Sequence, residues 1–149
     1  MKNIKNNQQG LSLIELIISI SIIILIMLAI YSLALYSMKV TADNQFYVEA
    51  TEIANQKMEH IINLPYNSVG LTSGIPNGVI PQDQTVRDVY HVHTNIKYFD
   101  DPYDGIESSG TDPLGNDYKI VTIKVSWQGK FGPKNLSIFS KIIPRTEEM

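Results

Sequence analysis

The sequence contains no cysteine. This absence excludes disulfide bonds, thiolate metal sites and cysteine nucleophiles, and it does not fix the cellular compartment. A strong charge of one sign is also lacking, because twelve Lys and Arg stand against fifteen Asp and Glu and the formal net charge is −3. Since the basic residues are scattered along the chain, the sequence predicts no direct binding of nucleic acid.

Recognisable catalytic motifs are missing as well. The sequence has no G-x-S-x-G nucleophile motif, no phosphate-binding P-loop and no H-E-x-x-H zinc motif. Internal repeats and low-complexity segments are also absent. We therefore predict a protein that is not an enzyme and that needs no resident cofactor.

Proline is absent from residues 11–64, and no charged residue occurs from Leu16 to Met38. A helix of that uncharged length spans roughly 35 Å at ~1.5 Å per residue, enough to cross a bilayer core of about 30 Å with some tilt. The preceding segment carries Lys2 and Lys5 and no acid. This asymmetry predicts a cytoplasmic N-terminus and an exported C-terminal domain, in a protein held in the cytoplasmic membrane by a single span.

Two simpler interpretations of this apolar segment stay open. A removable secretory signal has an apolar core of about 7–15 residues, which is shorter than the one here. Small residues in "SLALYSMKV" nevertheless leave a cut at that point possible. A plain single-pass anchor explains the length but gives no role to Gly10 or Glu15.

The stretch "QQGLSLIEL" resembles the processing site of type IV prepilins and pseudopilins. The resemblance implies that a prepilin peptidase removes the leader 1–10 by cutting after Gly10, and that Leu11 becomes the N-methylated first residue. The family usually has Phe at that position, so Leu11 puts the efficiency of methylation in doubt. It also implies that Glu15, the fifth residue after the cut, pairs with the terminal amine of a neighbouring subunit during filament assembly.

Physical chemistry gives this implied pairing a reason. Cleavage would leave a cationic amine on Leu11, and methylation keeps it cationic. A carboxylate at Glu15, in the first turns of the helix, also opposes the positive helix end, which is worth about 0.3–1 kcal/mol. Because an unpaired charge in an apolar bundle is far more costly than a paired one, the pair would act as a signal for recruitment and register.

The helical pattern continues beyond the apolar segment. One stripe at steps of three and four comprises Phe46, Ala50, Ile53, Ala54, Met58, Ile61 and Ile62. Pro65 is expected to stop the helix near Asn63. We predict a single helix over 11–63, with two helices broken near Thr41–Asn44 as the alternative. Major pilins often carry a bending proline near position 32, where this chain has Ser32, so the resemblance implies a less kinked helix.

The C-terminal part shows three alternating segments typical of half-buried strands. They are "VRDVYHVHTNIKYF", with Tyr90, Val92, Thr94, Ile96 and Tyr98 on one face; "DYKIVTIKVSW", with Val121, Ile123, Val125 and Trp127 inward; and "LSIFSKIIP", with Leu136, Ile138 and Ile142 together. "QGKFGPKN" is expected to be a hairpin-like connection. The predicted fold class is α+β, with a long N-terminal helix packed on a small antiparallel sheet.

Two polar groups are candidates for metal binding. His91 and His93 share one strand face and form half of a possible metal site, although a solvated surface is the favoured interpretation. The loop "DDPYDGIESSGTD" supplies oxygen ligands, and some pseudopilins bind calcium in this region. Solvated turns are the favoured alternative there too, because Asp and Gly are ordinary turn residues. The calcium candidates are Asp100, Asp101, Asp104, Glu107 and Asp112.

Two single residues receive structural assignments. Trp127 is expected in the core rather than on a ligand platform. His60 lies near the expected end of the helix, where a cation suits the helix dipole.

The chain as a whole resembles minor pilins of the type IV pilus modification protein kind and small pseudopilins of type II secretion. The segments that carry this resemblance are "IANQKMEHIINLPY", "KYFDDPYDGI" and "GTDPLGNDYKIVTIKVSW". It implies three parts: a cleaved leader 1–10, a transmembrane and filament-core helix 11–38, and a pilin-like globular domain 39–149.

The resemblance also implies a function, as a structural subunit of a pilus or secretion filament. Its implied partners are a prepilin peptidase, other major and minor pilins or pseudopilins, an inner-membrane assembly platform and membrane lipid. The alternative is a membrane-tethered, exported binding domain that never polymerises and whose sheet recognises a ligand such as a glycan. Processing after Gly10 discriminates between the two, because a tether that never assembles needs no such cut.

Overall fold

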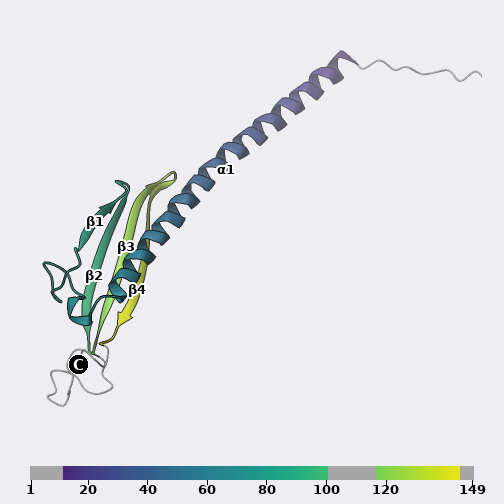
Figure 1. The fold of residues 1–149 in the computed structure, drawn as a ribbon. Coiled ribbons are helices and arrows are strands. Elements are labelled where there is room, and N and C mark those ends of the chain that lie inside the picture. Colours follow the sequence, from purple (N-terminus) through teal and green to yellow (C-terminus); the bar gives the residue numbers. More distant parts are fainter. Residues whose placement is uncertain (1–11, 101–116, 145–149) are drawn as a thin grey trace, which may run out of the picture. The chain divides into compact units, whose positions relative to one another are not determined.

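The structure, a computed structural model, describes residues 12–100 and 117–144. Helix α1 (Leu13–Ile62) and the short 3-10 helix η1 (Tyr66–Ser68) precede four strands (Figure 1). The strands are β1 (Asp83–Val86), β2 (Tyr90–Phe99), β3 (Tyr118–Gly129) and β4 (Gly132–Ile142). A long helix packed on an antiparallel sheet confirms the predicted α+β fold class.

Helix α1 is one continuous element, as the sequence predicted. The carbonyl of Ser12 accepts the first helical hydrogen bonds, from the backbone nitrogens of Glu15 at 3.0 Å and Leu16 at 3.1 Å. The helix passes without interruption through Thr41–Asn44, so the alternative of two helices is wrong. It ends at Ile62, shortly before Pro65, because a proline disfavours helical backbone at the residue preceding it.

The chain divides into two units, Met1–Thr41 and Ala42–Met149. In the second unit, the predicted apolar stripe of α1 faces the sheet: Ala50, Ile53, Ala54, Met58 and Ile61 are buried, and Phe46 is half-buried against them. Ile62 was wrongly placed in the stripe, since 44% of its surface is exposed. At ~100° per residue, Ile62 has already turned away from the face that Ile61 occupies.

The sheet has the strand order β1-β2-β3-β4, with every neighbouring pair antiparallel. Val121, Ile123, Val125 and Trp127 of β3 are buried as predicted, and so are Tyr90, Val92, Thr94 and Ile96 of β2. The prediction for β4 also holds, because Ile142 is buried and Leu136 and Ile138 pack partly buried against the core. Tyr98 shares this face, since its ring centre lies 5.4 Å from Lys119 Nζ, and it is 42% exposed near the end of β2.

Two features of the sheet differ from the prediction. Strand β1 was not expected, because its sequence "DQTV" is short and polar and lies at the sheet edge. The expected connection at 128–135 is in fact mostly strand: β3 runs to Gly129 and β4 begins at Gly132. Only Lys130 and Phe131 remain in the turn, and Gly132, with φ of +121°, provides backbone that side chains rarely allow.

Candidate functional site

Glu15, the residue to which the sequence assigned a role in assembly, lies in the first turn of α1. Its side chain is exposed, as is every residue from Ser12 to Lys39. The carboxylate is therefore at the end of the helix where the peptide dipole favours negative charge. The two processing candidates, Gly10 and Leu11, lie outside the described residues, so their roles stay predictions.

The exposed half of α1 is suited to an apolar surrounding. Its most apolar 18-residue window has a mean hydropathy of 3.0, and none of that window is buried within the chain. Three of its serines donate back to the helix: Ser19 Oγ to the carbonyl of Glu15 at 2.7 Å, and Ser21 Oγ to that of Ile17 at 2.8 Å. Ser32 does the same toward Leu28, at 3.0 Å. Since these hydroxyls are satisfied within the helix, they can enter a bilayer without an unpaired polar group.

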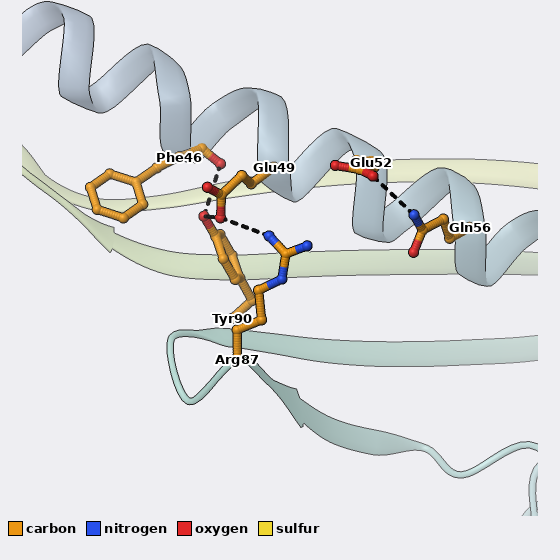
Figure 2. Close-up of polar contacts among 6 residues, drawn as sticks. All are labelled: Phe46, Glu49, Glu52, Gln56, Arg87 and Tyr90. Atoms are coloured by element: carbon orange, nitrogen blue, oxygen red, sulfur yellow. Dashed lines mark hydrogen bonds and ion pairs between the residues drawn. The ribbon is translucent and has the colours of Figure 1, made fainter.

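A polar cluster joins α1 to the β1–β2 hairpin (Figure 2). The Tyr90 hydroxyl donates to Glu49 Oε2 at 3.0 Å, and an Arg87 guanidinium nitrogen lies 3.1 Å from the same oxygen. Burial of Tyr90, reinforced by the hydrogen bond to Glu49, raises the pKa of this phenol to about 12. Arg87 and Asp88 both have positive φ, the signature of a type I′ turn. The cluster thus fixes one sheet end to the helix.

A second polar contact fixes the β3–β4 hairpin to the helix. Asp43 Oδ1 accepts from the backbone nitrogen of Lys130 at 2.7 Å, and Asp43 Oδ2 lies 3.7 Å from Lys134 Nζ. Gly129 makes this approach possible, because a Cβ at that position would lie 2.5 Å from Asp43 Oδ1. Sequence analysis missed Asp43 because it lies off the apolar stripe.

Lys119 is a buried cation on the inner face of β3. Only 2% of its surface is exposed. Its ammonium donates to the carbonyls of Tyr66 at 2.8 Å and Val69 at 2.7 Å, and it lies 4.3 Å from the centre of the Tyr66 ring. Burial lowers the pKa of this ammonium. Lys119 therefore ties the segment after α1 to the sheet. Its alternation with Val121 could have suggested its burial, but not its backbone partners.

The two strand histidines occupy the sheet face opposite the helix, as predicted. His93 Nδ1 lies 2.7 Å from Asp83 Oδ1, and His91 Nδ1 lies 3.3 Å from Thr85 Oγ1. Both partners come from β1, the strand that the sequence did not reveal. Among residues 12–100 and 117–144, no group of three or more metal-ligating side chains comes together. The described contacts thus agree with a solvated polar face.

The remaining candidates are Trp127, His60 and the carboxylates of the possible calcium site. Trp127 is 4% exposed and packs beside Tyr47 and Tyr90, which confirms its place in the core. His60 lies in the last turn of α1, as expected. Of the calcium candidates, Asp100 is half-buried. Asp101, Asp104, Glu107 and Asp112 lie outside the described residues, so calcium binding stays a prediction.

Comparison with protein families gives one match. Residues 5–31 match the model of the prokaryotic N-terminal methylation motif, which belongs to type IV prepilin-like sequences. Comparison with curated proteins and with solved structures gives no match. The match covers the segment from which the resemblance was inferred and ends within the exposed half of α1.

The motif and the helix together indicate the class of protein. The match at residues 5–31 supports the type IV prepilin and pseudopilin class for this chain. The apolar helix, which begins within the matched residues, supports a protein that is anchored in the inner membrane and associated with a pilus.

Proposed function

We propose that the chain is a minor pilin or pseudopilin, a structural subunit of a type IV pilus-like or type II secretion-like filament. The observation that carries the proposal is that three features adjoin one another in the N-terminal part of the chain. The methylation motif at 5–31 leads into an apolar helix whose first half is wholly exposed, and Glu15 lies in the first turn of that helix. A helix of this kind needs an apolar surrounding that the chain itself does not provide.

The proposed maturation begins in the cytoplasmic membrane. A prepilin peptidase cuts after Gly10, and Leu11 becomes the N-methylated first residue. The N-terminus stays on the cytoplasmic side, and the globular domain is exported. In this scheme residues 1–10 form the leader, 11–38 the membrane and filament-core helix, and 39–149 the pilin-like domain.

The proposed assembly step is a transfer of the apolar helix from lipid to neighbouring helices. Both surroundings are apolar, so the transfer changes the hydrophobic free energy of the helix little. The surroundings of the Glu15 carboxylate differ between the membrane and the filament. At the membrane surface water can reach its carboxylate, whereas in a filament core it requires a cationic partner. The terminal amine of a neighbouring subunit supplies that charge and sets the register.

The partners in this scheme are the prepilin peptidase, other pilins or pseudopilins, an inner-membrane assembly platform and the surrounding lipid. Pilin-type proteins with this motif are structural subunits, so the scheme contains no catalytic step. No nucleic acid or metal takes part in it.

The experiment that tests maturation is the intact mass and N-terminal sequence of the protein made with and without a prepilin peptidase. We expect a start at methylated Leu11 only when the peptidase is present. Gly10→Val should block the cut because a branched side chain replaces the last residue of the leader. An intact Met1 start beside an active peptidase would contradict the proposal and favour the tethered binding domain.

Assembly is tested separately with Glu15. The Glu15→Val variant should still be cut after Gly10 but should be missing from the sheared filament fraction. Asp88→Asn is the matched control, since it removes an exposed carboxylate from the β1–β2 turn, and it should be incorporated like the parent chain. Equal incorporation of the Glu15 variant would contradict the role of this carboxylate.

A further inference from the structure

The β3–β4 turn lies at the end of the sheet beside Asp43, far from the C-terminal end of α1. At one end of β3, Lys119 donates to the carbonyl of Tyr66, which follows the end of the helix. At the other end, the backbone nitrogen of Lys130 donates to Asp43, which precedes every buried residue of α1. The strand therefore runs back along the helix. Figure 1 shows this turn, formed by Lys130 and Phe131, and the β1–β2 turn at one end of the sheet.

The chain itself limits how far this turn can lie from the membrane. Leu16 to Met38 carry no charge, and Lys39 is the first charged residue after them. Asp43 comes four residues later, and even a fully extended chain covers at most about 14 Å over that distance. The headgroup layer on each side of a bilayer is itself about 5–7 Å thick. Because Asp43 binds Lys130 directly, the β3–β4 turn lies within reach of the headgroups where the chain leaves the bilayer.

The side chains of the turn are suited to a lipid interface. Phe131 is 49% exposed, and Lys130 is exposed beside it. An aromatic ring gains free energy on leaving water, and a lysine can place its ammonium among phosphates while its stem lies along apolar groups. The neighbouring acid opposes anionic lipid little. The side chain of Asp43 is only 13% exposed, and its second oxygen lies 3.7 Å from Lys134 Nζ.

The β1–β2 turn lies at the same end of the sheet but further along α1. Its Arg87 lies 3.1 Å from Glu49, and Glu49 follows Asp43 by six residues, or about 9 Å along the helix axis. The exposed carboxylate of Asp88 belongs to this second turn. The turn that is closest in the chain to the apolar segment therefore presents an aromatic ring and a cation, and the exposed acid is set back from it.

From these observations we propose that the β3–β4 turn is a lipid contact. Phe131 enters the boundary between headgroups and acyl chains of the leaflet on the exported side, and the Lys130 ammonium binds headgroup phosphate. The inference rests on the proposed function, because it requires the membrane anchor and the exported domain of a subunit before assembly. It requires no second copy of the chain, and the contact ends when the subunit leaves the lipid for the filament.

A weak contact is sufficient for this role. One aromatic ring and one lysine bind a membrane only loosely by themselves. In this chain α1 is the first anchor, so the turn meets the lipid at a high effective concentration. The contact limits the orientations of the globular domain above the membrane. Because it is weak, the subunit can give it up when its helix moves into the filament.

Lipid quenching in the full-length chain tests the position of Phe131. The Phe131→Trp variant is placed in vesicles of phosphatidylglycerol and a phosphatidylcholine that is brominated near the top of its acyl chains. Bromine quenches tryptophan on contact, and the parent chain gives the background because its single tryptophan, Trp127, is buried. Either direction of insertion places the turn beside the same lipids.

Phe139→Trp is the matched control for this measurement. Phe139 is 78% exposed, more than Phe131, but it lies on β4 about 23 Å from Gly132. We expect the tryptophan at position 131 to be quenched at least three times as strongly as the tryptophan at position 139. Equal quenching at the two positions, or quenching at 131 no stronger than in the parent chain, would overturn the proposal.

Charge reversal tests the role of Lys130. Adding Lys130→Glu to Phe131→Trp should lower the quenching several-fold, whereas Lys124→Glu, on the sheet face opposite α1, should leave it unchanged. Among the described residues other than glycine, only Arg87 and Asp88 have positive φ, so these substitutions do not strain the turn. Equal effects of the two reversals would contradict phosphate binding by Lys130.

A second measurement leaves Phe131 in place. The chain has no cysteine, so a polarity-sensitive fluorophore can be attached at Lys130→Cys alone. Its emission should move to shorter wavelength when the chain enters vesicles, and the emission of the same label at Lys124→Cys should not. Identical emission at both positions would also overturn the lipid contact.

Failure of this contact and failure of the proposed function are distinguishable. Chains that do not float with the vesicles, are never cut after Gly10 or never enter filaments contradict the proposed function. Chains that float with the vesicles but show no lipid quenching at position 131 overturn only the lipid contact of the turn.

Discussion

The Tyr90 hydroxyl connects the sheet to α1, and its ionisation should be visible in the stability of the fold. The pKa of this phenol rises from 10.0 to about 12 on folding. Stabilisation by the protonated phenol is therefore complete below pH 10 and is lost as the pH rises toward 12. Tyr90→Phe should reduce the alkaline loss, leaving the part due to Tyr66, whose pKa burial also raises. It should lower the free energy of unfolding at neutral pH by about 1 kcal/mol.

Thermal unfolding of the detergent-solubilised chain, followed by circular dichroism between pH 8 and 12, measures both effects. Tyr47→Phe is the matched control because Tyr47 is 52% exposed, and it should keep the alkaline loss. An unchanged pH profile in Tyr90→Phe would contradict the assignment of that loss to Tyr90.

Lys119 should contribute far more to stability than Lys124, the other lysine of β3. Lys119→Ala removes the donor to two carbonyls and empties space in the core, so we expect the free energy of unfolding to fall by at least about 2 kcal/mol. Lys124→Ala, on the exposed face of the same strand, should change it by no more than about 0.5 kcal/mol. Chemical denaturation of both variants checks this, and equal effects would disprove the bonding role of Lys119.

At the residue scale, the position of a residue was predictable where a single pattern, such as strand alternation, dominated. Contacts between segments that are distant in the chain were not predictable. Trp127 was assigned to the core correctly because strict alternation placed it with Val125. Lys119 was missed because its partners, the carbonyls of Tyr66 and Val69, are backbone atoms that carry no sequence signal. Asp43 was missed for the same reason, since it binds a backbone nitrogen.

At the scale of elements, the β3–β4 hairpin should depend on Asp43 as a fixed acceptor. Asp43→Ala should lower the free energy of unfolding by about 1 kcal/mol and speed amide hydrogen exchange at Lys130. Asp43→Asn should keep most of both properties, because its side-chain oxygen still accepts from Lys130 and only the long 3.7 Å ion pair with Lys134 is lost. Hydrogen exchange of the two variants, read by mass spectrometry, tests both expectations. Unchanged exchange at Lys130 in Asp43→Ala would contradict the contact between Asp43 and Lys130.

Helix and sheet were not equally predictable. The helix was predicted almost to the residue, since the apolar periodicity and Pro65 act locally. Strand β1 was missed because its pairing with β2 depends on Arg87 and Asp88 adopting positive φ, a conformation that Asn-Gly or Asp-Gly would have signalled. The length of β4 was underestimated because "GPKN" has the composition of a turn, yet it pairs with β3 in register.

At the scale of the whole molecule, the basic leader predicts one orientation in the membrane. In a strain without prepilin peptidase, Thr72→Cys should react with a membrane-impermeant maleimide on intact spheroplasts. Lys5→Cys should react only after lysis, because the positive leader is retained on the cytoplasmic side. The natural lack of cysteine makes each label unambiguous. The reverse pattern would contradict the proposed export of the domain.

The class that the motif supports was predictable because its signal is a short local motif next to a long apolar run. The family match at 5–31 covers that same segment. The surfaces by which the folded domain would meet a neighbour were not predictable in this way. Which side chains share the outer face of the sheet follows only from the register of β2, β3 and β4.

The order of the elements in the chain leaves the buried face of α1 uncovered for a time during synthesis. The buried residues of α1 precede, in the chain, every strand that packs on them. They are therefore synthesised first and have no packing partner until β3 has been synthesised. At synthesis rates of about 5–20 residues per second that interval is several seconds. Throughout it, an aliphatic surface lies next to a membrane with nothing of its own to pack against. Newly made chains should therefore need temporary cover during export, from lipid or from a chaperone, and should be degraded readily when β3 is truncated.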